Sequence, residues 1–307
     1  MRTLRLEQLN RDVSRLCLGT MVFTRAPREL TFDMLDLFVA SGGNLLDTAE
    51  VYGSEPAIAD WLEARDNRES IVILDKACHE LEDITVEGIR RGIATNLERI
   101  RSDYIDIWML HRDDPTKPVE VVVETANEEI DAGRIRAYGG SNWSTQRLQE
   151  TNEYAEARGL VGMIGSSEHL SLATPNEERW SGVRWIAADD LEWRESSGFP
   201  LFPWSSQAGG FFTGRFRPDD HSDAEMVRIY YSDDNFARLA RAEELAGERG
   251  ASSIQIALAY VLAQSFPTFP LIGPASMPEL EVCIEAEKID LSEAETQWLA
   301  MRTDTRS

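Results

Sequence analysis

The run Ile105-Asp106-Ile107-Trp108-Met109-Leu110-His111 decides the fold, because it is short, mostly apolar and flanked by longer amphipathic segments at 84–100 and 118–132. Such a run between amphipathic segments predicts a buried strand of a parallel sheet with a helix on either side. The same alternation recurs along the chain. Eight strands are predicted, over residues 16–18, 45–47, 71–74, 105–110, 135–138, 162–164, 201–204 and 269–272.

Between these strands the sequence has the periodicity of helices. The predicted helices cover residues 31–41, 55–64, 84–100, 118–132, 144–157, 189–196, 235–264 (two helices), 277–286 and 292–302. Ser144 and Ser252 stand where N-caps are expected, and Ser292 with Glu295 has the pattern of a capping box. Residues 205–234 form the longest irregular segment, and a loop of that length in a compact domain is usually functional.

Eight strand–helix units in 307 residues predict an α/β protein, folded as a single (β/α)8 TIM barrel over residues 1–307. The alternative is an open, doubly wound sheet, which binds a dinucleotide through a glycine-rich turn after its first strand. Here the first strand is followed by Gly19-Thr20-Met21-Val22, which lacks the G-x-G-x-x-G pattern. The barrel is therefore the favoured prediction.

The charge balance excludes several classes of protein. The chain has 31 Lys and Arg against 54 Asp and Glu, a formal charge of −23, and it lacks the basic patch that nucleic acid or an anionic membrane requires. No stretch has the ~20 apolar residues of a membrane span, and the N-terminus lacks the apolar core of a secretory signal, so we expect a soluble, cytoplasmic protein. The three cysteines are far apart and the four histidines lack metal-ligand spacing, so we expect neither disulfides nor a metal site.

Polar residues follow several predicted strands at the ends where a barrel carries its chemistry. These residues are Asp47 and Tyr52 after strand 45–47, Lys76 after strand 71–74, and His111 after strand 105–110. Lys76 is one of only three lysines, and a buried ammonium without a counter-charge is costly, so its position at the end of an apolar strand indicates function. We expect the four side chains to meet at one mouth of the barrel.

Together these four side chains suit the reduction of a carbonyl group. A tyrosine acts as a general acid if its pKa of about 10 is lowered toward the working pH, and the Lys76 ammonium is expected to lower the pKa of Tyr52. Asp47 would hold the ammonium in place, and His111 would orient the carbonyl oxygen. Taken singly, each residue also has a structural interpretation, such as a helix cap, a loop aromatic or a strand-end histidine.

Five segments carry a resemblance to a known family. They are Leu-Cys-Leu-Gly-Thr-Met at 16–21, Leu-Asp-Thr-Ala-Glu-Val-Tyr-Gly at 46–53, Asp-Lys at 75–76, Tyr-Ile-Asp-Ile-Trp-Met-Leu-His at 104–111 and Gly-Arg-Ile-Arg-Ala-Tyr-Gly-Gly-Ser-Asn-Trp at 133–143. Through them the chain resembles the aldo-keto reductases over nearly its whole length. The resemblance implies a nicotinamide cofactor, NADP(H) or NAD(H). It also implies a catalytic tetrad of Asp47, Tyr52, Lys76 and His111, with Tyr52, His111 and Trp143 contacting the substrate.

The resemblance further implies a set of cofactor contacts. Ser141 and Asn142 would bind the nicotinamide carboxamide, and Trp204 would stack on the ring. Segment 205–215 would lie over the pyrophosphate, and Ser166 stands where the family commonly has a carboxamide-binding glutamine. The full set is Thr20, Met21, Asp47, Ser141, Asn142, Ser166, Trp204, Ser205, Gln207, Gly210, Arg215, Gly273, Ser276 and Glu279.

One departure from the family pattern bears on the choice of cofactor. Ala275 stands where the family typically has a basic residue that binds the 2′-phosphate of NADP(H), and Glu279 adds a carboxylate nearby. A carboxylate accepts a hydrogen bond from a free 2′-hydroxyl but repels a 2′-phosphate. The sequence therefore leaves both NADP(H) and NAD(H) as candidates.

The prediction from the sequence is an NAD(P)H-dependent reductase of a small aldehyde or ketone, including sugar-like ketones. Two other classes remain open: a cofactor-sensing binding module of the same fold, and an epimerase or isomerase that uses the cofactor without net redox change. The intact set of four polar residues favours the reductase over the binding module. The sequence carries no signal for the oligomeric state.

Overall fold

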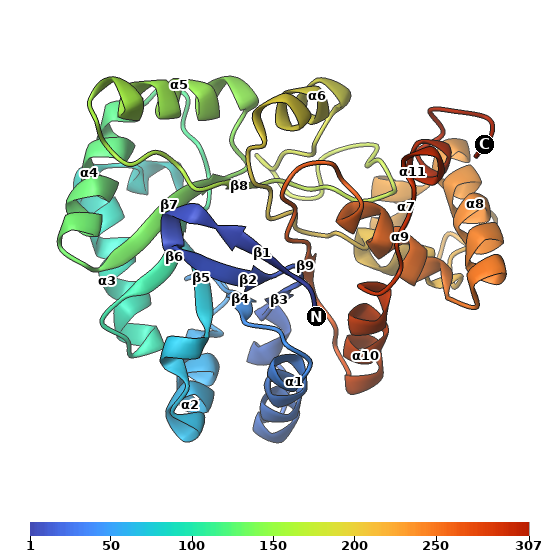
Figure 1. Cartoon of the computed structure of the whole chain (residues 1–307), viewed down its shortest axis with the longest axis horizontal. Coiled ribbons are helices and arrows are strands. Elements are labelled where there is room, and N and C mark those ends of the chain that lie inside the picture. Colours follow the sequence, from blue (N-terminus) through green and yellow to red (C-terminus); the bar gives the residue numbers. More distant parts are fainter. Residues whose placement is uncertain (307) are drawn as a thin grey trace.

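The computed structural model describes residues 1–306. At its centre is a parallel sheet of seven strands in the order β8-β7-β6-β5-β4-β3-β9, with helices arranged around the outside (Figure 1). The strands are β3 (Cys17–Gly19), β4 (Leu45–Asp47), β5 (Val72–Ala77), β6 (Ile105–Leu110), β7 (Ile135–Ser141), β8 (Ser166–Ser167) and β9 (Leu271–Ile272).

The two edges of this sheet are joined by the segment at 201–204. The Phe202 amide donates to the Ser166 carbonyl at 2.8 Å, and the Leu271 amide donates to the Pro203 carbonyl at 2.9 Å. Leu201 forms single parallel bridges to Ser166 on one side and to Thr268 on the other. The segment therefore occupies the eighth strand position, and the predicted (β/α)8 architecture is confirmed, although this position has isolated bridges instead of a full strand.

One predicted strand is wrong. The sequence predicts a strand at 162–164, whereas the strand in this part of the sheet is β8, at 166–167. The Met163 amide donates to the side chain of Asn152 at 2.7 Å instead of to a neighbouring strand. A β-carbon at Gly165 would lie 2.8 Å from the Pro200 carbonyl, so the backbones approach closely there and a side chain would not fit.

The structure also contains a hairpin that the sequence did not predict. Strand β1 (Thr3–Leu6) pairs antiparallel with β2 (Arg11–Ser14). Leu6 and Val13 of this hairpin pack in one cluster with Leu45 and Val72, which stand at the starts of β4 and β5. The hairpin therefore covers the amino-terminal end of the barrel and leaves the carboxyl ends of the strands for chemistry.

The helices follow the predicted order. They are α1 (Arg28–Ala40), α2 (Glu55–Arg65), α3 (Val86–Ile100), α4 (Val119–Asp131), α5 (Thr145–Ala157), α6 (Ala188–Ser197), α7 (Ala224–Tyr230), α8 (Asp233–Arg249), α9 (Ser253–Leu262), α10 (Met277–Ala286) and α11 (Glu293–Leu299). The expected pair of helices at 235–264 is confirmed, since Gly250 ends α8 in a left-handed conformation. Helix α7 lies inside the segment expected to be irregular. None of the helices in the described part of the chain is both long and apolar enough to cross a bilayer.

Alternation along the strands decides which side chains face the barrel interior. Leu74 of β5 and Met109 of β6 belong to a cluster built only from strand, hairpin and loop residues, so they point inward. Their neighbours Ile73 and Trp108 pack with helix residues and point outward. Because strand side chains alternate with a period of two, the next inward positions are Lys76 after Leu74 and His111 after Met109.

Candidate active site

A buried ion pair joins the ends of β4 and β5. The Lys76 ammonium donates to the Asp47 carboxylate, and it also donates to the Thr48 carbonyl at 2.8 Å. Both charged side chains are almost fully buried. Burial lowers the pKa of Lys76, but the charges of Asp47 and Tyr52 raise it more, so the net pKa lies above the ordinary value of lysine. Lys76 is therefore a fixed cation at physiological pH.

Tyr52 lies above this cation, on the turn that follows β4. The Lys76 Nζ atom is 5.4 Å from the centroid of the Tyr52 ring. Burial raises the pKa of Tyr52, and the opposing effect of Lys76 is smaller, so the net pKa is above that of a free tyrosine. Lys76 thus lowers the pKa of Tyr52 as expected, but burial is the larger effect and the net shift is upward.

His111 faces Tyr52 across the mouth. The two rings meet edge to face with centroids 5.8 Å apart. Burial, followed by the charge of Lys76, holds the pKa of His111 well below its ordinary value, so the ring is neutral. Its Nδ1 atom is buried and has no hydrogen-bond partner within residues 1–306. The structure therefore brings together all four side chains that the sequence placed at the strand ends.

Two further residues stand beside His111 and were missed by the sequence analysis. Arg112 donates from Nη1 to the His111 carbonyl at 2.9 Å, and its Nη2 atom lies 3.3 Å from Nε2 of His79. The His79 ring is 5.2 Å from the His111 ring, edge to face. The available signal was a basic residue directly after the strand-end histidine.

Ser141 and Asn142 are buried together at the end of β7. Asn142 donates to the Ser141 hydroxyl at 3.0 Å, and that hydroxyl donates to the Ser167 carbonyl at 2.9 Å. Asn142 adopts a left-handed conformation with φ of 65°, which re-aims its side chain just past the strand. Its amide oxygen accepts from the Arg184 amide at 3.2 Å. A pair of amide and hydroxyl groups is thus fixed near His111.

The hydroxyl of Ser166 is engaged by hydrogen bonds to other side chains of the protein. Its hydroxyl donates to Glu168 at 2.8 Å and accepts from Arg194 of α6 at 2.7 Å, and all three residues are buried. The structure therefore engages Ser166 in tying helix α6 to β8, and it does not bring this hydroxyl to the four strand-end residues as a free contact.

Trp204 and the loop after it form another part of the mouth. The Trp204 ring stacks on His169, with centroids 5.0 Å apart, and lies 5.7 Å from the ring of the exposed Trp180. Its Nε1 atom is buried without a partner within the described residues. Four residues of the following loop have positive φ: Ser205, Ala208, Gly209 and Gly210. The Ala208 and Gly210 amides donate to the Ser205 and Gln207 carbonyls at 2.8 and 2.9 Å, so these turns are closed by hydrogen bonds within the loop.

The remaining predicted cofactor contacts lie in different environments. Thr20 is fully buried and donates to the Asp47 carbonyl at 2.9 Å, whereas Met21 is exposed. The Gln207 side chain accepts from Cys283, and Arg215 lies 3.5 Å from the Gly209 carbonyl.

At the start of α10 the chain runs from the exposed Gly273 to Ser276, which caps the helix. The Glu279 carboxylate of the first turn accepts from the Ala275 amide at 2.7 Å. This carboxylate therefore occupies the N-terminal end of α10, where an anionic group of a ligand would otherwise be favoured.

Trp143 does not line the mouth. Only 1% of its surface is exposed, and it packs in the cluster that contains Trp108 and Leu148. Its Nε1 atom donates to the Arg112 carbonyl at 3.2 Å. The prediction that Trp143 contacts the substrate does not fit this placement, because the indole lies in the core behind Arg112.

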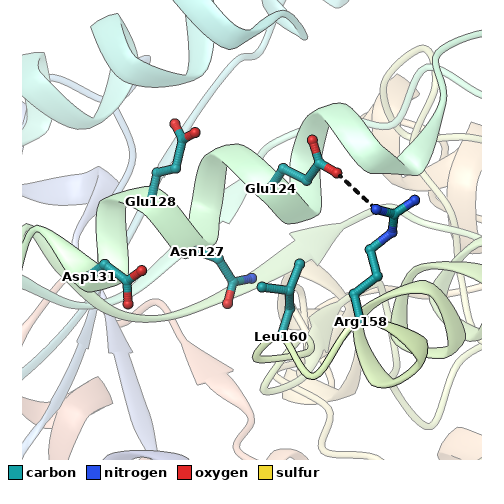
Figure 2. Close-up of a pocket in the computed structure, with 6 residues that line it drawn as sticks. All are labelled: Glu124, Asn127, Glu128, Asp131, Arg158 and Leu160. Carbon is teal, nitrogen blue, oxygen red and sulfur yellow. Dashed lines mark ion pairs between the residues drawn. The ribbon is translucent and has the colours of Figure 1, made fainter.

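A hollow of about 490 Å³ lies elsewhere, on the outer helix layer. Figure 2 shows its lining by α4 and by the chain after α5, where Arg158 pairs with Glu124 at 3.7 Å. Its remaining lining residues are Asn127, Glu128, Asp131 and Leu160. None of these residues belongs to the strand ends, so the hollow is separate from the site.

Comparisons with known proteins identify the family of this chain. The model of the Aldo/keto reductase family matches residues 15–300. Norsolorinic acid reductase stcV of Emericella nidulans is 29% identical over 92% of this chain and 76% of its own length. The uncharacterized oxidoreductase YrpG of Bacillus subtilis is 28% identical over 91% of this chain and 89% of its own length. The aryl-alcohol dehydrogenase (NADP(+)) of Phanerodontia chrysosporium is 27% identical over 92% and 77%.

Among solved structures, the thermostable aldo-keto reductase Tm1743, crystallised with the inhibitor epalrestat, has the same fold. It matches with a TM-score of 0.76 and 22% identity, over 99% of this chain and 100% of the other. The family match covers more than half of the chain, and the fold agrees with it. The chain therefore belongs to the aldo/keto reductase family of NAD(P)-dependent oxidoreductases.

Proposed function

We propose that this protein, as a single domain over residues 1–307, reduces a small aldehyde or ketone to an alcohol, with Tyr52 as the proton donor. The observation that carries the proposal is the buried Lys76–Asp47 pair below the Tyr52 ring, with the His111 ring facing it at 5.8 Å. A buried cation beside a tyrosine and a neutral imidazole stabilises negative charge at a carbonyl oxygen.

The residues at the mouth suit a nicotinamide dinucleotide. The loop at 205–210 would lie against the pyrophosphate, and the Trp204 Nε1 atom, which has no partner within residues 1–306, is a buried polar group near the ring site. Ser141 and Asn142 would hold the carboxamide, and Arg215 would reach the phosphates. When bound, the reduced cofactor supplies a hydride.

The electrostatics of the four residues indicate which of them donates the proton. The raised pKa of Tyr52 keeps its hydroxyl protonated at neutral pH, and the Lys76 ammonium, which opposes that rise, favours transfer of the proton to the carbonyl oxygen. The Lys76 ammonium stabilises the phenolate that remains, and Asp47 keeps the ammonium in place. His111, held neutral, donates one hydrogen bond to the same oxygen and fixes its position.

The cofactor choice is part of the proposal. Ala275 offers no positive charge, and the Glu279 carboxylate is held beside its amide. This arrangement disfavours a 2′-phosphate and suits a free 2′-hydroxyl, so we propose that NAD(H) is accepted alongside NADP(H).

A titration and a turnover assay test the proposal. Tryptophan fluorescence would be followed during titration with NADPH and with NADH, and then loss of the reduced cofactor would be followed with a panel of aldehydes and ketones. The panel includes aromatic carbonyl compounds, since relatives are named for norsolorinic acid and aryl alcohols, and sugar-like ketones. Net consumption of cofactor supports a reductase. Cofactor binding without turnover supports a binding module, and conversion without net consumption supports an isomerase.

A further inference from the structure

Arg112 is a half-buried cation at the carboxyl ends of β5 and β6 that has no role in the proposed reaction. Its two hydrogen-bond partners are both neutral acceptors. They are the His111 carbonyl at 2.9 Å and His79 Nε2 at 3.3 Å. Because a guanidinium only donates, Nε2 of His79 must accept, and Nδ1 then carries the hydrogen directed to Glu80 at 3.0 Å. His79 thus supports Arg112 as a hydrogen-bond acceptor.

The neighbouring acids are all engaged elsewhere. Asp113, the next residue, pairs with Arg147 at 3.2 Å, and Asp47 pairs with Lys76. Glu80 contacts His79. Within residues 1–306, no carboxylate oxygen lies within 4.0 Å of an Arg112 nitrogen. In a chain with 54 acidic residues, this cation beside the reacting groups has no carboxylate in direct contact within residues 1–306, although the charge of Glu80 acts on it from a greater distance.

A partly desolvated cation without a counter-ion is unfavourable, and an incoming anion would relieve that cost. Burial lowers the pKa of Arg112, but a guanidinium remains charged at any physiological pH. The planar fork of a guanidinium matches the two oxygens of a carboxylate and binds it with charge-assisted hydrogen bonds. The hydrogen bonds to the His111 carbonyl and to His79 use one N–H each of Nη1 and Nη2. The guanidinium of Arg112 therefore keeps three N–H groups that can bind a ligand.

An anion bound to Arg112 would lie close to the place where the substrate reacts. Arg112 contacts the backbone of His111 and the ring of His79, and the His79 and His111 rings are 5.2 Å apart. His111 in turn faces Tyr52. A group bound to Arg112 therefore lies beside the place where the carbonyl oxygen would meet Tyr52 and His111. The Trp143 Nε1 atom donates to the Arg112 carbonyl, and this hydrogen bond holds the backbone of Arg112 in place.

We infer that Arg112 is a substrate-recognition residue that binds a carboxylate, so that the favoured substrates are carbonyl compounds carrying a carboxylate near the reacting carbonyl group. This inference rests on the proposed reductase function. The net charge of −23 opposes an anionic substrate at long range. At 0.15 M ionic strength, however, charges beyond about 8 Å are screened, whereas a contact pair in a half-buried site is screened much less.

The test compares substrates of the same shape and different charge. 4-Carboxybenzaldehyde is paired with 4-carbamoylbenzaldehyde, and succinic semialdehyde with its methyl ester, all at 0.15 M ionic strength. The ratio of kcat/KM for the charged and neutral member of each pair is measured in the wild type, in Arg112→Gln, in Arg112→Lys and in Arg158→Gln. Arg158 is a matched control because it is an exposed arginine of the outer helix layer, and its replacement changes the net charge equally.

In at least one pair, the wild type is expected to favour the charged member by about 10-fold or more, and Arg112→Gln to lower that ratio by about 30-fold, the effect of losing hydrogen bonds to a charged group. Arg112→Lys should keep part of the preference, and Arg158→Gln should keep all of it. A wild type without preference in either pair, or a ratio unchanged in Arg112→Gln, overturns the inference while leaving the reductase function intact. Circular dichroism and thermal melting establish that each variant is folded.

A binding measurement separates the inference from the proposed function. Benzoate is titrated calorimetrically into the wild type and into Arg112→Gln, each with NADP+ present. Binding that is at least 10-fold weaker in Arg112→Gln supports the carboxylate contact even if none of the aldehydes is turned over. Equal benzoate binding in the two proteins contradicts the contact, whether or not the reductase function holds.

Discussion

The Lys76 ammonium and the Asp47 carboxylate form an ion pair in which both side chains are at most 3% exposed. Such a pair is costly to desolvate and contributes little net stability, yet removing one partner leaves a buried charge unpaired. A hydrophobic pair would hold the same strand ends together without this cost. The pair is therefore better explained by the charge it places below Tyr52 than by stability.

This explanation predicts strong coupling between the two residues. Asp47→Leu and Lys76→Met should each destabilise the fold by about 3–5 kcal/mol, because each leaves one buried charge unpaired. The double variant should lose much less than the sum, while reductase activity is lost in all three. Urea unfolding of the four proteins gives the coupling free energy. Additive losses would show that the two charges do not depend on each other.

The raised pKa of the buried Glu168 carboxyl predicts how the stability of the fold changes with pH. Burial raises the pKa of Glu168 from 4.5 to about 7, and Arg194 opposes this only in part. The folded protein therefore holds this proton more tightly than the unfolded chain, so the contribution is fully present below pH 4.5 and is lost as pH rises toward 7. The loss corresponds to roughly 3 kcal/mol at 1.36 kcal/mol per pH unit.

Comparison with Glu168→Gln isolates this effect from other titrating groups. The unfolding free energy of the wild type minus that of the variant should fall by up to roughly 3 kcal/mol between pH 4.5 and pH 7.5. Denaturant titrations at several pH values supply the difference. Parallel curves for the two proteins would mean that folding does not shift the pKa of Glu168.

The start of α10 predicts a change in cofactor preference. Ala275→Arg combined with Glu279→Gln adds a cation and removes a carboxylate at the place proposed for the adenosine 2′ position. The affinity for NADPH should rise by about 10-fold or more relative to NADH, since charge-assisted hydrogen bonds to phosphate are gained. The ratio of the two Kd values is measured by fluorescence titration. An unchanged ratio would locate the 2′ group elsewhere.

The burial of Trp143 predicts that replacing it lowers the stability of the fold without changing the KM for a substrate. Trp143→Phe leaves a void in the core and deletes the hydrogen bond to the Arg112 carbonyl, so the fold should lose about 1–3 kcal/mol. The KM for a neutral aldehyde should stay within about twofold of wild type. If KM rises strongly while stability is unchanged, the indole contacts the substrate as the family resemblance implied.

The sequence predicted the strand-end residues well because their placement depends on local rules. Lys76 and His111 lie two residues after the inward-facing Leu74 and Met109, so their side chains face the same way. The carboxyl ends of parallel strands also meet at one edge of the sheet. It missed the hairpin at 3–14, because four-residue strands without a typical two-residue turn carry little signal. The sequence placed strand β8 too early, at 162–164 instead of 166–167, because the close approach of Gly165 to Pro200 depends on a distant segment.

Other features were beyond the sequence because they depend on tertiary burial. The sign of the Tyr52 pKa shift follows from how far the ring is desolvated, which outweighs the nearby Lys76. Trp143 is a core residue and Ser166 is engaged by Glu168 and Arg194, and neither fact follows from a motif. Arg112 was overlooked because its one local signal, a basic residue directly after the strand-end histidine, is weak in a chain with many arginines.

The most direct test of the central claim is the turnover number of Tyr52→Phe, measured with a saturating aldehyde and reduced cofactor. Removing the proton donor should lower kcat by at least about 100-fold, because general acid catalysis contributes about 10²–10⁴. The Kd for the cofactor should stay near the wild-type value in the same preparation. A variant that retains more than about a tenth of the wild-type kcat would contradict the assignment of Tyr52 as the acid.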